Sequence, residues 1–216
     1  MTDSPVFTKT YADLPFDLKE AMRYSGYKHA VCEDAGPVED IYNEIKGCFT
    51  YKVCYREFPV EISGETVDFG FTAINSISLC KLLKNSKKCI IFAATLGLGI
   101  DRAIARAGVA SPAKALIMQG IGAERIETLC DRFQADMESE YGCVTGRFSP
   151  GYGDLPLEMQ RDIFTVLDCQ RKIGLTLNDS LLMTPMKSVT AIFGIGLGRE
   201  TEKCKGCEKD NCEYRR

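Results

Sequence analysis

Histidine is almost absent from this chain of 216 residues, which contains only His29. Zinc enzymes draw several of their ligands from histidine, and serine or cysteine nucleophiles commonly use a histidine as their base. A single histidine therefore argues against zinc catalysis through several histidines and against a Ser/His or Cys/His nucleophile pair. We expect His29 to be a structural or surface residue.

The chain also lacks a basic excess, a long apolar run and a signal peptide. Its 27 Lys and Arg residues against 30 Asp and Glu residues give a net charge of -3 with interspersed signs, which excludes a basic footprint for nucleic acid. No uninterrupted apolar run is long enough to cross a membrane. The start Met-Thr-Asp-Ser does not have the basic-then-apolar order of a signal peptide, so we expect a cytoplasmic protein.

The length of 216 residues suits one domain, or one domain with an appendage, and 45% apolar residues are enough for a sizeable core. We divide the chain into a domain over residues 1–198 and a cysteine-bearing tail over residues 199–216. Eight of the eleven cysteines are scattered through the domain, and in a reducing compartment we expect most of them to be buried small apolar residues. These eight are Cys32, Cys48, Cys54, Cys80, Cys89, Cys130, Cys143 and Cys169.

The other three cysteines, Cys204, Cys207 and Cys212, lie in a polar stretch with no core to bury them. Thiolates at this spacing can hold zinc or an iron–sulfur cluster, with a fourth ligand from elsewhere, for which Cys143 and Cys169 are candidates. The alternative is a tail with reduced thiols and no metal. The spacing does not decide between them.

Hydrophobic periodicity predicts a mixture of helices and strands. Helices are expected over residues 17–23, 37–45, 75–83, 111–141 and 156–173. Strands are expected over residues 50–62, 67–71, 89–96, 175–177, 181–183 and 188–195. The apolar run from Cys89 to Leu96 indicates a buried strand, and the glycines within the helix over 111–141 indicate that another segment packs closely there.

Two features along the chain invite a functional interpretation that the residues alone do not support. Gly97-x-Gly99 follows a strand, as in dinucleotide-binding loops, but Arg102 stands where a third glycine is needed, so a tight turn into a helix is favoured. Glu124 and Arg125 are compatible with a solvated helix face.

The loop from Arg147 to Pro156 carries the strongest functional signal. Between Gly146 and Pro156 there are three glycines and two prolines, which exclude a regular helix or a central strand. Arg147 suits a carboxylate, Tyr152 can stack on a ligand, and a glycine beside them allows close approach to the main chain. The alternative is an ordinary surface turn.

Asp154 is placed to cap the helix expected from Pro156, which would put this loop at a helix N-terminus. Free N–H groups and a partial positive charge beside Arg147 would then suit an anionic group.

Several motifs in sequence order link this loop to a known family. They are Ala123-Glu124-Arg125-Ile126, Arg147-x-x-Pro150-Gly151-Tyr152, Leu175-Thr176-x-x-x-Ser180 and Met183-x-Pro185-x-x-Ser188-Val189. Together they resemble the activation domain of cobalamin-dependent methionine synthase, over about residues 89–193. The ordered set is more specific than any single motif.

The resemblance implies an α+β fold with a twisted antiparallel sheet, flanking helices and a site for S-adenosylmethionine. It implies that Arg147 binds the ligand's carboxylate, that the backbone at Ser149 hydrogen-bonds the ligand, and that Tyr152 packs at the mouth facing the corrin. Gly151 belongs to the same cofactor-binding loop. No residue is expected to act as a catalytic acid or base.

The resemblance also implies a reaction and partners. In this family, one electron and a methyl group from S-adenosylmethionine return oxidised cobalamin to methylcobalamin. This chain would act on a separate methionine synthase or related corrinoid protein, with an electron donor such as flavodoxin or ferredoxin. The alternatives are a non-catalytic chaperone for a corrinoid protein and a metal-bearing electron-transfer module.

Overall fold

The structure is a computed structural model, and it describes residues 4–27 and 35–195. The N-terminal half contains β1 (Phe7–Tyr11), α1 (Leu18–Tyr24), α2 (Gly36–Ile45), the 3₁₀ turn η2 (Lys46–Cys48), β2 (Tyr51–Pro59), β3 (Glu61–Ser63), β4 (Thr66–Asp68), β5 (Ala73–Asn75), α3 (Ile77–Leu83) and β6 (Lys88–Thr95). The second half contains α4 (Leu98–Ala110), α5 (Pro112–Tyr141), α6 (Met159–Leu167), α7 (Cys169–Ile173), β7 (Thr176–Leu177), β8 (Met183–Thr184) and β9 (Ser188–Ile195).

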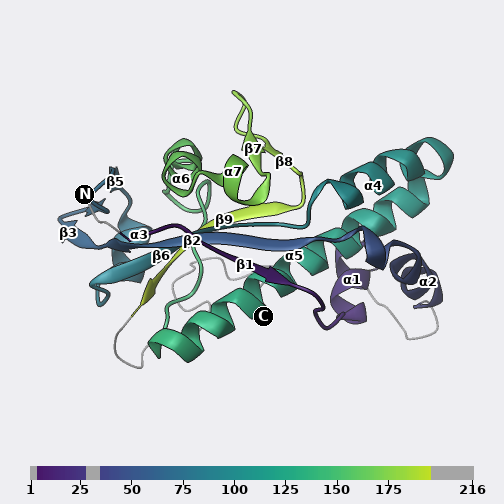
Figure 1. Cartoon of the computed structure of the whole chain (residues 1–216), viewed down its shortest axis with the longest axis horizontal. Coiled ribbons are helices and arrows are strands. Elements are labelled where there is room, and N and C mark those ends of the chain that lie inside the picture. The colour runs from purple at the N-terminus through teal and green to yellow at the C-terminus, as the bar shows by residue number, and fades with distance from the viewer. Residues whose placement is uncertain (1–3, 28–34, 196–216) are drawn as a thin grey trace.

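A four-stranded antiparallel sheet in the order β1-β2-β6-β9 forms the centre of the molecule (Figure 1). In its register Tyr55 of β2 lies opposite Phe92 of β6, and Phe92 lies opposite Ala191 of β9. Small sheets of β3-β4-β5 and β7-β8 accompany it. The predicted α+β fold with an antiparallel sheet is confirmed.

Helices cover both faces of the central sheet, with α5 on one face and α6 and α7 on the other (Figure 1). Successive side chains of a strand point to opposite faces, so β6 contributes to two cores. Ile90, Phe92 and Ala94 belong to the core beneath α5, whereas Cys89, Ile91 and Ala93 belong to the core beneath α6. This two-sided burial explains why β6 is a continuous apolar run.

The long helix α5 begins and ends as its sequence predicts. The Ser111 side chain accepts a hydrogen bond from the Lys114 N–H at 3.3 Å, and Gly142 ends the helix at φ +81°. Its glycines allow other segments to approach, as expected. A Cβ on Gly120 would lie 2.6 Å from the backbone nitrogen of Ser25 in the segment after α1.

Gly97 and Gly99 are also explained by packing. A Cβ on Gly97 would lie 2.0 Å from the Thr50 hydroxyl, and one on Gly99 would lie 2.2 Å from the Cys48 carbonyl oxygen. Both glycines therefore let the turn between β6 and α4 pack against the start of β2, in agreement with the predicted tight turn.

The structure differs from the predicted elements in several places. The strand expected over residues 50–62 is divided in the structure: β2 ends at Pro59, and β3 pairs with β4 in a separate sheet. The helix expected over residues 156–173 starts at Met159 and breaks at Asp168, whose φ of 50° is left-handed. The edge strand β1 was not predicted.

None of the helices in the described ranges has both the length and the apolar character that crossing a membrane requires.

Candidate functional site

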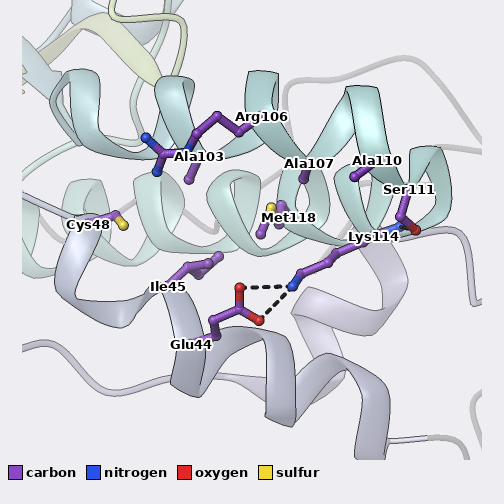
Figure 2. A pocket seen from close by; sticks show the side chains of 10 residues that line it. All are labelled: Glu44, Ile45, Cys48, Ala103, Arg106, Ala107, Ala110, Ser111, Lys114 and Met118. Carbon is purple, nitrogen blue, oxygen red and sulfur yellow. Dashed lines mark hydrogen bonds and ion pairs between the residues drawn. The ribbon is translucent and has the colours of Figure 1, made fainter.

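A pocket of about 280 Å³ lies between α2, α4 and the first turns of α5 (Figure 2). Ile45, Ala103 and Met118 provide apolar walls, and an ion pair between Lys114 and Glu44 at 2.6 Å closes one side. The predicted loop contacts α5 from Glu127 onward, through a hydrogen bond from Arg147. Met118 lies about 14 Å along the helix from Glu127. This pocket is therefore distinct from the predicted site.

The predicted loop starts as an extension of the central sheet. The Phe148 N–H donates to the Ile192 carbonyl of β9 at 2.9 Å, and the Ile192 N–H donates back at the same distance. Phe148 packs into the core beneath α6. Since neighbouring side chains of an extended segment point in opposite directions, Arg147 is directed to the α5 side.

Beyond Phe148 the chain closes into a compact turn. The Gly151 N–H donates to the Leu155 carbonyl at 2.9 Å, and the Tyr152 N–H donates to the Ser149 carbonyl at 3.2 Å. Gly151 has φ +89°, which only glycine adopts readily. The turn presents the Tyr152 ring to solvent with 69% of the residue exposed.

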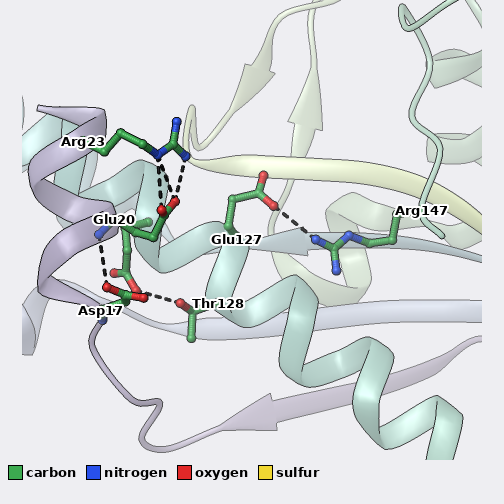
Figure 3. Close-up of polar contacts among 7 residues, drawn as sticks. Asp17, Glu20, Arg23, Glu127, Thr128 and Arg147 are labelled. Carbon is green, nitrogen blue, oxygen red and sulfur yellow. Dashed lines mark hydrogen bonds and ion pairs between the residues drawn. The ribbon is translucent and has the colours of Figure 1, made fainter. Parts of the chain in front are cut away.

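Three side chains of α5 hold the Arg147 guanidinium. Nη1 donates to Asp131 at 2.8 Å and to Gln134 at 3.1 Å, and Nη2 donates to Glu127 at 3.1 Å. Figure 3 shows Arg147 reaching from its loop to Glu127 on the helix. The spacing of four and then three residues places the three acceptors on one helix face.

Arg147 is held mainly by acidic side chains. Two carboxylates face one guanidinium, and the side chain of Arg147 is only 20% exposed. The neighbouring Cys130 adds no charge at neutral pH, because burial raises the pKa of its thiol to about 12. Among the described residues, Glu127 and Asp131 thus share one guanidinium.

The predicted cap by Asp154 is wrong. Its carboxylate accepts hydrogen bonds from the Ser76 hydroxyl and the Ile77 N–H, both at 2.6 Å, so it caps α3. Helix α6 starts later, and no side chain caps its first turn by a hydrogen bond. Asp154 therefore ties the loop to α3, and the expected helix N-terminus directly after the loop does not form.

The solvated face expected for Glu124 and Arg125 is also wrong, because the two residues are 2% and 0% exposed. Arg125 donates to Glu124 at 2.6 Å and to the Leu14 carbonyl at 2.9 Å. The Asp17 N–H donates to Glu124 at 3.1 Å. This buried ion pair attaches the segment between β1 and α1 to α5.

The scattered cysteines of the domain are mostly buried, as predicted, and the structure leaves them reduced. Cys54 and Cys169 lie with their sulfur atoms 3.9 Å apart, and this contact together with burial raises the pKa of the Cys169 thiol. Cys143 is exposed. In residues 4–27 and 35–195 no group of three or more potential metal ligands forms. His29, Cys32, Cys204, Cys207 and Cys212 lie outside the described residues.

Glu127, Asp131 and Gln134 belong to this site but were not predicted from the sequence. Their spacing places them on one face of α5, but the same spacing is typical of a solvated helix surface. Only the antiparallel pairing of Phe148 with Ile192 brings Arg147 over that face.

The fold and the loop together define a class of protein. The structure is similar to the crystal structure of the MetH reactivation domain bound to AdoHcy, with a TM-score of 0.66 and 12% sequence identity. The similarity covers 88% of this chain and 78% of that chain. The chain therefore has the fold of a reactivation domain.

A sequence family agrees with this fold. The family described as the vitamin B12 dependent methionine synthase activation domain matches residues 131–215, which include Asp131 and the whole loop from Arg147 to Pro156. The resemblance predicted from the sequence motifs is thereby confirmed. No curated protein matches the chain.

Proposed function

We propose that this protein binds S-adenosylmethionine and supports the reductive remethylation of cob(II)alamin on a separate methionine synthase or related corrinoid protein. The observation that carries the proposal is the family match over residues 131–215, which contains the Arg147 loop on a reactivation-domain fold. The solved neighbour bound to AdoHcy, the demethylated form of the ligand, supports the same class of ligand.

In this proposal the loop binds the methionine end of the ligand. Arg147 binds the carboxylate, and the backbone at Ser149 and Gly151 lies along the ligand. Gly151 adopts a positive φ and has no side chain, so the ligand can approach the backbone there. Tyr152, exposed at the tip of the turn, covers the mouth that faces the corrin.

Arg147 does not start from an unpartnered state. Its two terminal nitrogens already donate to Asp131, Gln134 and Glu127. The ligand's carboxylate therefore shares the guanidinium with these acceptors or replaces one of them, while the carboxylates stay close to the ligand's ammonium group. A zwitterionic ligand fits this mixed arrangement better than a simple anion does.

The contribution of the protein to catalysis is positioning. Methylcobalamin would form from cob(II)alamin with one electron, from a donor such as flavodoxin or ferredoxin, and the methyl group of S-adenosylmethionine. Because the methylation makes the unfavourable reduction effectively irreversible, the protein's task is to hold the sulfonium methyl over the metal and to exclude water. This requires no general acid or base, in keeping with the scarcity of histidine.

Calorimetry with S-adenosylmethionine tests the proposal. We expect saturable one-to-one binding by the wild type. If no heat of binding appears at millimolar ligand, the proposal fails, and the alternatives of a corrinoid-protein chaperone or an electron-transfer module take its place.

We further propose that Cys204, Cys207 and Cys212 hold zinc or an iron–sulfur cluster. The support is their spacing in a polar segment. Cys143 is exposed and so accessible as a fourth ligand, whereas Cys169 is buried beside Cys54. Elemental analysis of anaerobically purified protein separates zinc from iron, and absence of both metals would contradict this proposal.

A further inference from the structure

We propose that Cys54 and Cys169 form a disulfide bond on oxidation by a small disulfide such as oxidised glutathione, and that this bond clamps α7 onto the central sheet. Both residues are buried in the core beneath α6. Neither belongs to the proposed ligand site, so the inference is independent of the proposed function.

The first observation is the contact between the two thiols. Cys54 lies in β2, where it pairs with Ala93 of β6, and Cys169 is the first residue of α7. Their sulfur atoms are 3.9 Å apart, although 115 positions separate the two residues in the chain. Because a disulfide bond needs a sulfur–sulfur distance of about 2 Å, each sulfur has to move by about 1 Å, which a change in side-chain rotation can provide.

The second observation is that two other buried thiols of the domain are held away from this pair. Cys89 belongs to the same core, but it pairs with Phe58, four residues along β2 from Cys54, which is about 14 Å in an extended strand. Cys130 belongs to the core on the opposite face of the sheet. The fold thus sets Cys54 against Cys169 and against neither of these two thiols.

Helix α7 provides the route by which an oxidant reaches the pair. While α7 is packed, Cys54 and Cys169 are 0% and 1% exposed, and the contact with Cys54 together with burial raises the pKa of the Cys169 thiol. Since the thiolate is the reactive form, the packed pair reacts slowly. The helix has five residues and lies between two left-handed residues, Asp168 at φ 50° and Gly174 at φ 74°. So short a helix has few hydrogen bonds of its own, and we expect it to open locally more readily than the strands do.

The exchange is balanced in two steps. The Cys169 thiol loses its proton, and the thiolate attacks one sulfur of oxidised glutathione, which forms a mixed disulfide and releases one glutathione. The Cys54 thiolate then attacks the Cys169 sulfur and releases the second glutathione. The two protein thiols are thereby oxidised, the glutathione disulfide is reduced, and both protons end on the released glutathione thiols.

The bond would cross-link two elements that are distant in the chain. It would close a loop that spans 115 positions, and a cross-link over so long a loop restricts the unfolded chain and so stabilises the folded state. It would also join α7 covalently to a central strand, so that the helix could no longer leave the sheet. We therefore expect the face that carries α6 and α7 (Figure 1) to be more stable in oxidising than in reducing conditions.

The test incubates the full chain in native buffer with excess oxidised glutathione, followed by alkylation of the remaining thiols, proteolysis and mass spectrometry. We expect a peptide containing Cys54 to be linked to a peptide containing Cys169. The midpoint of thermal unfolding of the oxidised protein should lie roughly 5–15 °C above that of the reduced protein, and dithiothreitol should reverse the shift.

Cys54→Ala and Cys169→Ala should each lose the shift when the oxidised variant is compared with its own reduced form. Cys130→Ala is the matched control, because it removes a buried thiol from the other core and should keep both the linked peptide and the shift. Absence of the linked peptide from the oxidised wild type would overturn the inference. A linked peptide without a rise in the midpoint, or a shift that persists in Cys169→Ala, would overturn the clamp.

Discussion

Arg147 combines two roles that depend on different parts of the chain. Its loop pairs with β9 through Phe148, and α5 supplies the acceptors for its guanidinium. The residue thus joins the long helix to the edge of the sheet at the point where the ligand is proposed to bind. Its replacement should affect both binding and local stability.

Replacing Arg147 by Ala should weaken binding of S-adenosylmethionine by about 1.5–3 kcal/mol, as expected for the loss of a charge-assisted hydrogen bond. Arg147→Lys keeps the charge but not the planar fork, so we expect an intermediate loss. Calorimetry measures both variants. An affinity equal to that of the wild type in Arg147→Ala would remove this residue from the site.

Arg125 offers a prediction about stability. Because Arg125→Met leaves the buried Glu124 carboxylate without its cationic partner, it should lower the free energy of unfolding by about 3–5 kcal/mol. Urea denaturation measures the change. The control is Arg132→Ala on the same helix, which removes a side chain that is 58% exposed and pairs with Asp136, and it should cost less than about 1 kcal/mol. Equal losses in the two variants would contradict the structural role of the buried pair.

How much of the site the sequence predicts can be judged residue by residue. Arg147 and Tyr152 could be predicted as site residues because the glycines and prolines around them exclude a regular helix or a central strand and indicate a shaped loop. The partners Glu127 and Asp131, and the burial of Glu124, depend on contacts between segments far apart in the chain. Local patterns contain no information about such contacts.

At the scale of elements, α5 organises the molecule. It packs along one face of the central sheet and contacts α1 and α4. It also contains the buried Arg125–Glu124 ion pair and the side chains that accept hydrogen bonds from Arg147. Its length and limits were predictable, since Ser111-Pro112 and Gly142 are strong signals for a helix start and end. The end of β2 at Pro59 and the break at Asp168 were not predictable. The first goes with the pairing of β3 to β4 in a separate sheet, and the second with a single left-handed residue.

Gly120→Ala should destabilise the protein by about 1–3 kcal/mol, because the added methyl group would overlap the backbone of Ser25. Gly108 in α4 is the matched control. A Cβ there has open space, and alanine is the better helix former, so Gly108→Ala should be neutral or should stabilise by up to about 1 kcal/mol. Thermal denaturation compares the two variants, and a tolerated alanine at position 120 would contradict the close contact between α5 and the segment after α1.

Asp154→Asn should weaken the cap of α3 and lower the free energy of unfolding by about 1 kcal/mol at pH 7. The hydrogen bond from Ser76 lowers the pKa of the Asp154 carboxyl, so the stabilisation is present above the unfolded-state pKa near 4 and is lost as pH falls through the folded-state pKa. Denaturation curves of the wild type and the variant should therefore converge in acid. A difference that stays constant down to pH 2 would show that the carboxylate is not the stabilising group.

At the scale of the whole molecule, the sheet separates two cores and leaves the Arg147 loop at the edge beside β9. The α+β class with an antiparallel sheet was implied by the family resemblance, whereas the residue patterns alone predicted helices and strands without the order of the strands in the sheet. The division of the chain at residue 198 and the metal at the terminal cysteines remain predictions.

The most direct test of the account is methyl transfer itself. Wild-type protein is mixed with an inactive cob(II)alamin form of methionine synthase that lacks its own activation domain, together with a reductant and S-adenosylmethionine labelled in its methyl group. We expect labelled methylcobalamin with the wild type and much less with Arg147→Ala. If the wild type binds S-adenosylmethionine but yields no more labelled methylcobalamin than a mixture without it, its proposed role in remethylating this partner is contradicted.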